Sequence, residues 1–136
     1  MRISMDTTEF DVARIHRYLS RESYWARGLS QGVLNKAMQH SLCFGGYLKN
    51  IQVAFARVVS DRATFAHLKD VFVLPEYRGR GFGVALIKAV MAHPDLARVG
   101  FTLSTNDAHG LYERFGFVRQ DGSERVMVRP GSFLPS

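Results

Sequence analysis

Apolar residues recur at helical spacing in the first part of the chain, most clearly within residues 10–19 and 33–38. Asp6, Thr7, Thr8 and Glu9 have the pattern of a capping box, which predicts a helix from there to about residue 19. A loop is expected over residues 21–28 and a second helix over residues 30–42. Residues 2–5 have the composition of a short opening strand.

The hydrophobic period changes after residue 42, where three strands are expected over residues 43–48, 51–59 and 64–74. Because short turns join these strands, they should form an antiparallel meander. A helix over 81–92, a strand over 99–104, a short helix over 108–115 and a hairpin of 117–119 with 125–129 follow. The helix over 81–92 connects two strands, which should therefore be parallel and joined by a right-handed crossover. The pattern predicts an α/β fold on one mixed sheet.

Composition and charge are those of a soluble globular chain. The 136 residues suit a single domain spanning 1–136, and neither a repeat nor a linker marks a boundary within them. A hydrophobic fraction of 46% and a charged fraction of 22% exclude a wholly disordered or fibrous protein. The net charge of +6 favours an anionic partner, such as a phosphate-bearing ligand or a nucleic acid.

Other features bear on the compartment. The single cysteine, Cys43, excludes a disulfide within the chain, and its place at the start of an apolar strand indicates a buried structural thiol. Residues 1–6 lack the apolar stretch of a secretory signal. The most apolar segment, residues 84–92, is far shorter than the ~20 residues of a membrane span. We therefore expect a cytoplasmic protein without membrane contact.

A glycine-rich loop lies between an expected strand and an expected helix, with the sequence Arg78-Gly79-Arg80-Gly81-Phe82-Gly83. Glycines let backbone N–H groups approach a ligand, and the helix N-terminus adds unpaired donors and a positive dipole end. The arginines add cationic side chains that suit phosphate. The loop therefore predicts a phosphate or pyrophosphate site. Val84 stands where a dinucleotide-binding fingerprint needs glycine, and the lysine of a P-loop is missing, so the loop is neither of these.

Two motifs, about 30 residues apart, resemble those of the GNAT superfamily of N-acetyltransferases. The first is Arg78-x-x-Gly81-x-Gly83, preceded by Val71-x-Val73-x-Pro75. The second, Ala108-His109-Gly110-Leu111-Tyr112-Glu113-Arg114-Phe115-Gly116-Phe117, is similar to the family's recurring A-x-x-L-Y-x-x-x-G-F segment. The resemblance covers nearly the whole chain and is weakest over residues 1–42. It implies a mostly antiparallel sheet with a central splayed parallel strand pair and helices on both faces.

The resemblance also implies acetyl-CoA as co-substrate, with its coenzyme A part between the strands over 64–74 and 99–104. The backbone of Val71, Phe72 and Val73 would pair with the pantetheine arm. The loop of Arg78, Gly79, Arg80, Gly81, Phe82 and Gly83 would hold the pyrophosphate. Tyr112 matches the family tyrosine near the sulfur, which implies a general acid for the leaving thiolate. Where the family often has Asn, this sequence has Thr105 followed by Asn106, and both are candidates for a pantetheine contact.

The implied reaction transfers an acetyl group to a primary amine by direct attack on the thioester. Tyr24 and Trp25 lie on the loop that commonly lines the acceptor pocket in such proteins, and their rings suit an apolar or cationic acceptor. Asp70, which precedes Val71, is a candidate general base. Alternation along the strand predicts His67 on the opposite face from Asp70. A water chain without a dedicated base is a further alternative.

Two other functions are alternatives. A domain of this fold could hold coenzyme A or an acyl-CoA as a sensor without turnover. The second alternative is a basic protein that binds nucleic acid. The arginines are spread along the chain and not clustered, which argues against this alternative. The five histidines lack metal-ligand spacing, so no metal is expected. We expect a small-molecule or peptide amine as acceptor and no nucleic-acid partner. A homodimer is common in proteins of this kind.

Overall fold

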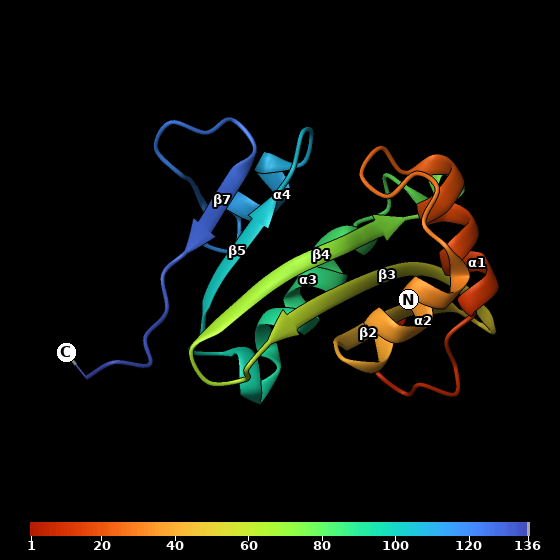
Figure 1. The fold of residues 1–136 in the computed structure, drawn as a ribbon, viewed down its shortest axis with the longest axis horizontal. Coiled ribbons are helices and arrows are strands. Elements are labelled where there is room, and N and C mark those ends of the chain that lie inside the picture. Colours follow the sequence, from red (N-terminus) through yellow and green to blue (C-terminus); the bar gives the residue numbers. More distant parts are fainter. Residues whose placement is uncertain (136) are drawn as a thin grey trace.

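A seven-stranded sheet forms the centre of the computed structural model, which describes residues 1–135 (Figure 1). Its strands are β1 (Arg2–Ser4), β2 (Leu42–Leu48), β3 (Ile51–Ser60), β4 (Phe65–Val73), β5 (Gly100–Ser104), β6 (Val118–Arg119) and β7 (Val126–Arg129). The order across the sheet is β1-β2-β3-β4-β5-β7-β6, and β4 with β5 is the parallel pair among antiparallel neighbours. The predicted mixed, mostly antiparallel sheet is confirmed.

Helices cover both faces of the sheet, as expected. They are α1 (Val12–Arg17), which continues into a π-helical turn (Tyr18–Glu22), α2 (Gln31–Gln39), α3 (Phe82–Ala92) and α4 (His109–Glu113), with 3-10 turns at Pro75–Tyr77 and Pro94–Leu96. In Figure 1, α3 lies behind the sheet and α1 and α2 lie on the other side. Two apolar cores result, one between the sheet and α3 and one between the sheet and α1 with α2. None of the helices in residues 1–135 is long and apolar enough to cross a membrane.

The expected capping box is wrong. The carboxylate of Asp6 accepts the backbone N–H of Thr8 in a local turn, and Glu9 forms an ion pair with Arg2 at 2.7 Å. Both acids are therefore used outside the helix. Helix α1 begins directly after Asp11, whose carboxylate accepts a backbone N–H in the first turn.

A β-bulge interrupts the pairing of β3 with β4. Phe55 pairs with Phe72 and Arg57 pairs with Lys69, so two steps along β3 match three steps along β4. Asp70 lies inside this interval and has a φ of 56°, in the left-handed region that L-residues rarely adopt. The extra residue shifts the alternation of side chains between the two faces of β4.

The consequence is visible in the side chains before and after the bulge. Leu68 packs in the core beside α3, whereas Phe72, four residues later, packs in the core beside α1 and α2. His67, the neighbour of Leu68, therefore points to the same face as Asp70, which contacts the loop before α2. The expectation that His67 and Asp70 lie on opposite faces is wrong, because unbroken alternation does not hold across a bulge.

The parallel strands β4 and β5 separate soon after they meet. Their pairing covers residues Phe65, Ala66 and His67 of β4, and the last pair joins His67 to Thr102. Beyond this point the two strands diverge, as the yellow-green and cyan arrows of Figure 1 show. The C-terminal half of β4 thus has a backbone edge beyond its pairing with β5.

Candidate active site

A cavity of about 600 Å³ lies beside the diverging part of β4 and reaches the N-terminus of α3. Its lining includes most of the residues predicted to hold the coenzyme: Val71, Phe72, Val73, Arg78, Gly79, Gly81, Phe82 and Gly83. The strand edge and the glycine loop, which are separate in sequence, therefore face one space.

The backbone at the start of α3 requires glycine. Gly79 and Gly81 have φ values of 79° and 80°, and Gly81 is the N-cap of α3. A Cβ at either position would meet nothing within 4 Å, so the requirement comes from backbone conformation and not from space. The first turn of α3 faces the cavity with its N–H donors, and such a helix end attracts anions. The geometry fits a pyrophosphate.

The two arginines of the loop are placed differently. Arg78 donates from Nε to the carbonyl of Val73 and from Nη2 to the hydroxyl of Tyr18, both at 2.9 Å. It therefore ties the loop to β4 and to the π-helical turn. Arg80 lies with its guanidinium 5.7 Å from the centre of the Tyr77 ring. Arg78 is the one that lines the cavity.

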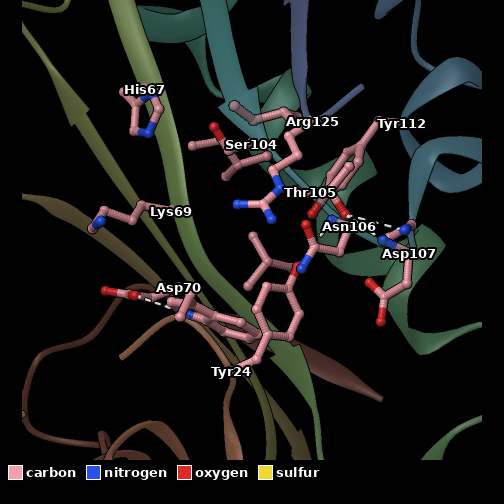
Figure 2. A pocket seen from close by; sticks show the side chains of 15 residues that line it. Tyr24, His67, Lys69, Asp70, Ser104, Thr105, Asn106, Asp107, Tyr112 and Arg125 are labelled. Atoms are coloured by element: carbon pink, nitrogen blue, oxygen red, sulfur yellow. Dashed lines mark hydrogen bonds between the residues drawn. The ribbon is translucent and has the colours of Figure 1, made fainter. Parts of the chain in front are cut away.

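A second cavity, of about 330 Å³, lies between β4 and β5 on the side of α1 and α2 (Figure 2). The predicted residues Tyr24, Trp25, Asp70, Thr105 and Asn106 line it. Six residues line both cavities: Tyr24, Trp25, Val71, Asp107, Ala108 and Tyr112. The two spaces therefore meet, and Tyr112 is at their junction.

Tyr112 is held on α4 with 6% of its surface exposed. Its ring packs edge-on against Phe117, which follows the helix. Burial, and secondarily the charges of Tyr24 and Asp107, raise the pKa of the Tyr112 hydroxyl well above its usual value. The hydroxyl therefore stays protonated at neutral pH and is available as a donor.

Thr105 and Asn106 make contacts within the protein. The Thr105 hydroxyl accepts the backbone N–H groups of Asp107 and Ala108, and so supports the entry to α4. The backbone N–H of Asn106 donates to the hydroxyl of Tyr24 at 3.0 Å. This bond ties the loop before α2 to the segment that follows β5.

Asp70 is already engaged on both oxygens. Trp25 Nε1 donates to Oδ1 and Arg57 Nε donates to Oδ2, each at 2.9 Å. The side chains of Arg57 and Asp70 are 10% and 4% exposed. Sequence reasoning missed Arg57, although a lone arginine within the apolar run of residues 53–59 is a signal for such a buried pair.

His67 is half-buried in the same cavity, with Nδ1 2.7 Å from the hydroxyl of Thr102. Burial, together with the nearby charges of Lys69 and Arg57, lowers the pKa of His67 below its ordinary 6.5. The imidazole is therefore neutral at pH 7. Lys69, Ser104 and Arg125 also line the cavity and were not predicted, because only the bulge and the pairing of β5 with β7 bring them there.

The single cysteine lies away from these cavities. Cys43 is buried, as expected, and burial raises the pKa of its thiol to about 11. Within residues 1–135, no three His, Cys, Asp or Glu side chains gather in a way that could hold a metal ion.

Comparison with known proteins shows which protein family this sequence and fold resemble. The sequence model of the acetyltransferase (GNAT) domain matches residues 39–119. A Gibberella zeae protein provisionally named an acetyltransferase is 31% identical over 93% of this chain and 85% of its own length.

Solved structures agree. A crystal structure from Xanthomonas campestris pv. campestris, provisionally named a GNAT-family acetyltransferase, is 54% identical with a TM-score of 0.84 and covers 88% of this chain and 85% of that chain. Rv2747 of Mycobacterium tuberculosis, solved in complex with CoA, shares the fold at 17% identity and a TM-score of 0.73, over 91% of this chain and 75% of that chain. With a splayed parallel pair, a glycine loop before α3 and a matching sequence model, the chain belongs to the GNAT family of acetyltransferases.

Proposed function

We propose that this protein transfers an acetyl group from acetyl-CoA to a primary amine. One observation carries the proposal: a long cavity suited to the coenzyme and a smaller cavity suited to an acceptor meet at Tyr112. Acetyl-CoA supplies the acyl group as an activated thioester. The chain's task is to hold both substrates so that amine and thioester meet at this junction.

The larger cavity supports coenzyme binding. The first turn of α3, preceded by Gly79 and Gly81, presents backbone N–H groups to the pyrophosphate. The backbone of residues 71–73 offers a strand edge to the amide-bearing pantetheine arm. Arg78 keeps the loop next to this edge through its bond to the Val73 carbonyl.

Tyr112 supplies a proton to the leaving thiolate. An acceptor that arrives as an ammonium ion first releases one proton to solvent. The neutral amine then forms an N–C bond while the C–S bond breaks, so the amine loses one further proton and the thiolate gains one. The Tyr112 hydroxyl is protonated at neutral pH and lies where the two cavities meet. A buried donor at this point favours departure of the thiolate.

His67 is the favoured proton acceptor on the acceptor side. Asp70 is a poor candidate, because its two oxygens accept from Trp25 and Arg57, and a proton would have to displace a charge-assisted bond. His67 is neutral at pH 7 and lines the acceptor cavity. Passage of the proton from His67 to Tyr112 through water restores the starting state.

Calorimetric titration with acetyl-CoA tests the proposal, with dephospho-CoA as a control for the phosphate contacts. Saturable one-to-one binding should be followed by thiol release when a reactive primary amine is added. Binding without thiol release for any amine would favour a coenzyme A sensor of the same fold. No binding at millimolar acetyl-CoA would contradict both readings.

A further inference from the structure

Two cationic side chains line the acceptor cavity. Lys69 extends from β4 just before the bulge, and Arg125 directly precedes β7, next to the end of β5. In Figure 2 the guanidinium of Arg125 projects into the space between the strands, whereas Lys69 extends from β4 with its ammonium directed away from Arg125. The backbone carbonyl of Arg125 accepts the N–H of Thr105 at 2.9 Å. This hydrogen bond holds the backbone of Arg125 beside the segment that follows β5.

Within the described part of the chain, no carboxylate forms an ion pair with either of these two cations. Residues 1–135 contain four ion pairs by distance, and neither Lys69 nor Arg125 belongs to one. Asp70, on the cavity floor, is paired with Arg57. The carboxylate of Asp107 turns away from Arg125 in Figure 2. The lining of the acceptor cavity therefore includes two cationic side chains that form no ion pair within the described residues.

The remaining lining suits a small polar molecule. The volume of about 330 Å³ is near the lower end for small-molecule sites. Ser104 offers a hydroxyl, and the rings of Tyr24 and Trp25, which meet edge-on at 5.0 Å, form a wall near Tyr112. An acceptor can thus place its amine at the junction and its other end at the guanidinium of Arg125.

We propose that the acceptor is a small primary amine that carries an anionic group, bound at the guanidinium of Arg125, with Lys69 as a second cation in the lining of the same cavity. A carboxylate, sulfonate or phosphate accepts paired hydrogen bonds from a guanidinium and a further one from an ammonium group. A second positive charge on the acceptor would be repelled by these two cations. This inference rests on the proposed function, because it names the substrate class of the same site.

A matched series of small amines tests it. β-Alanine, taurine and O-phosphoethanolamine carry a carboxylate, a sulfonate or a phosphate two carbons from the amine, and so separate the three anions. Ethanolamine and β-alaninamide are neutral counterparts, and 1,3-diaminopropane is the cationic one. Thiol release with acetyl-CoA gives kcat/KM for each amine. Ligand-observed NMR with the protein alone reports binding without turnover.

A second test of the proposal uses variants that remove one of the two positive charges. Arg125→Gln and Lys69→Gln should each raise KM for the preferred anionic amine by about tenfold or more, with a smaller change in kcat, because a hydrogen bond to a charged group is lost. Arg119→Gln and Lys88→Gln remove the same charges from exposed positions on β6 and α3, outside both cavities, and should leave KM unchanged.

The outcomes separate this inference from the proposed function. A preference for anionic amines that falls in both cavity variants supports the inference. Neutral or cationic amines used equally well, with no effect of the variants, would overturn it while acetyl transfer stands. Binding of β-alanine that depends on Arg125, without thiol release from any amine, would support an anion site at Arg125, contradict acetyl transfer and so overturn the assignment of this site to an acceptor. Absence of both binding and thiol release across the series would overturn the inference.

Discussion

The Nε atom of Arg57 lies 2.9 Å from Oδ2 of Asp70, within an ion pair that is almost fully buried. The other oxygen of the same carboxylate accepts from Trp25, so one side chain joins β3, the bulge of β4 and the loop before α2. Asp70 also has a left-handed backbone, a conformation that costs free energy and needs support from neighbours. The buried pair therefore stabilises the bulge that shapes the acceptor side of the cleft.

Asp70→Ala should destabilise the protein by about 3–5 kcal/mol, because it leaves the Arg57 guanidinium buried without a partner. Asp70→Asn should cost less, since it keeps an acceptor and a residue type that tolerates a left-handed backbone. Urea denaturation measures both. The matched control is Asp95→Ala, because Asp95 pairs with Arg62 in solvent and its loss should cost less than about 1 kcal/mol. Equal losses at the two positions would contradict a structural role for the buried pair.

Tyr112→Phe should lower turnover by roughly 10²–10⁴-fold, the usual contribution of a positioned general acid. Coenzyme affinity should remain, because the ring and its packing against Phe117 are kept. Thiol release measures the first effect and calorimetry the second. Tyr47→Phe is the control: its hydroxyl is buried without a partner within the described residues and lies outside both cavities. Unchanged turnover in Tyr112→Phe would exclude the general-acid role.

Gly81→Ala should destabilise the protein by about 1–2 kcal/mol, because a non-glycine residue must adopt a φ of 80° there. It should also weaken acetyl-CoA binding, since relaxation of the strain would turn the first N–H groups of α3 from the cavity. Calorimetry and urea denaturation test the two effects. Gly32→Ala, inside α2 with nothing within 4 Å of its Cβ, should instead stabilise by about 0.5–1 kcal/mol. Equal changes in the free energy of unfolding for the two variants would show that the left-handed backbone at Gly81 does not contribute measurably to stability.

The coenzyme side of the site could be predicted from the sequence because it depends on local backbone chemistry. The glycines at 79 and 81, the helix they introduce and the strand before them are contiguous, so the pattern alone predicts their geometry. Tyr112 is singled out by the resemblance of its flanking segment to the GNAT motif, and the structure places it in the lining of both cavities. In contrast, the capping box at residues 6–9 failed because a turn and an ion pair with β1 compete for the same acids.

The acceptor side could be predicted only in part: Tyr24, Trp25 and Asp70 line the smaller cavity, but its other residues depend on contacts between distant segments. Because β4 has one extra residue, His67 and Asp70 point to the same face of the sheet. The hydrophobic pattern of residues 64–74 does not predict this bulge. Arg125 reaches the cavity only through the antiparallel pairing of β7 with β5. The proposed general base and the proposed anion site consist of such residues and could be inferred only from the assembled strands.

His67 should make activity fall as the pH falls through its folded pKa, which lies below the ordinary 6.5. Burial and the charges of Lys69 and Arg57 lower its pKa, while Asp70 raises it, and the net shift is downward. The imidazole is therefore neutral at pH 7, and kcat/KM should decline about tenfold per pH unit only below its folded pKa. The same shift adds stability above pH 6.5 that is lost as the pH falls through the folded pKa.

The acceptor amine also titrates, so pH profiles need two acceptors whose amines differ in pKa. The acidic limb that belongs to His67 should stay at the same pH when the acceptor changes, whereas the limb that belongs to the amine should move. In His67→Gln the fixed limb should disappear and the rate at pH 7 should fall by about 10²-fold or more. His40→Gln, an exposed position at the end of α2, is the control and should keep the limb. A fixed limb that survives in His67→Gln would assign the proton transfer to water or to Asp70, because no imidazole would then be present at this position to titrate.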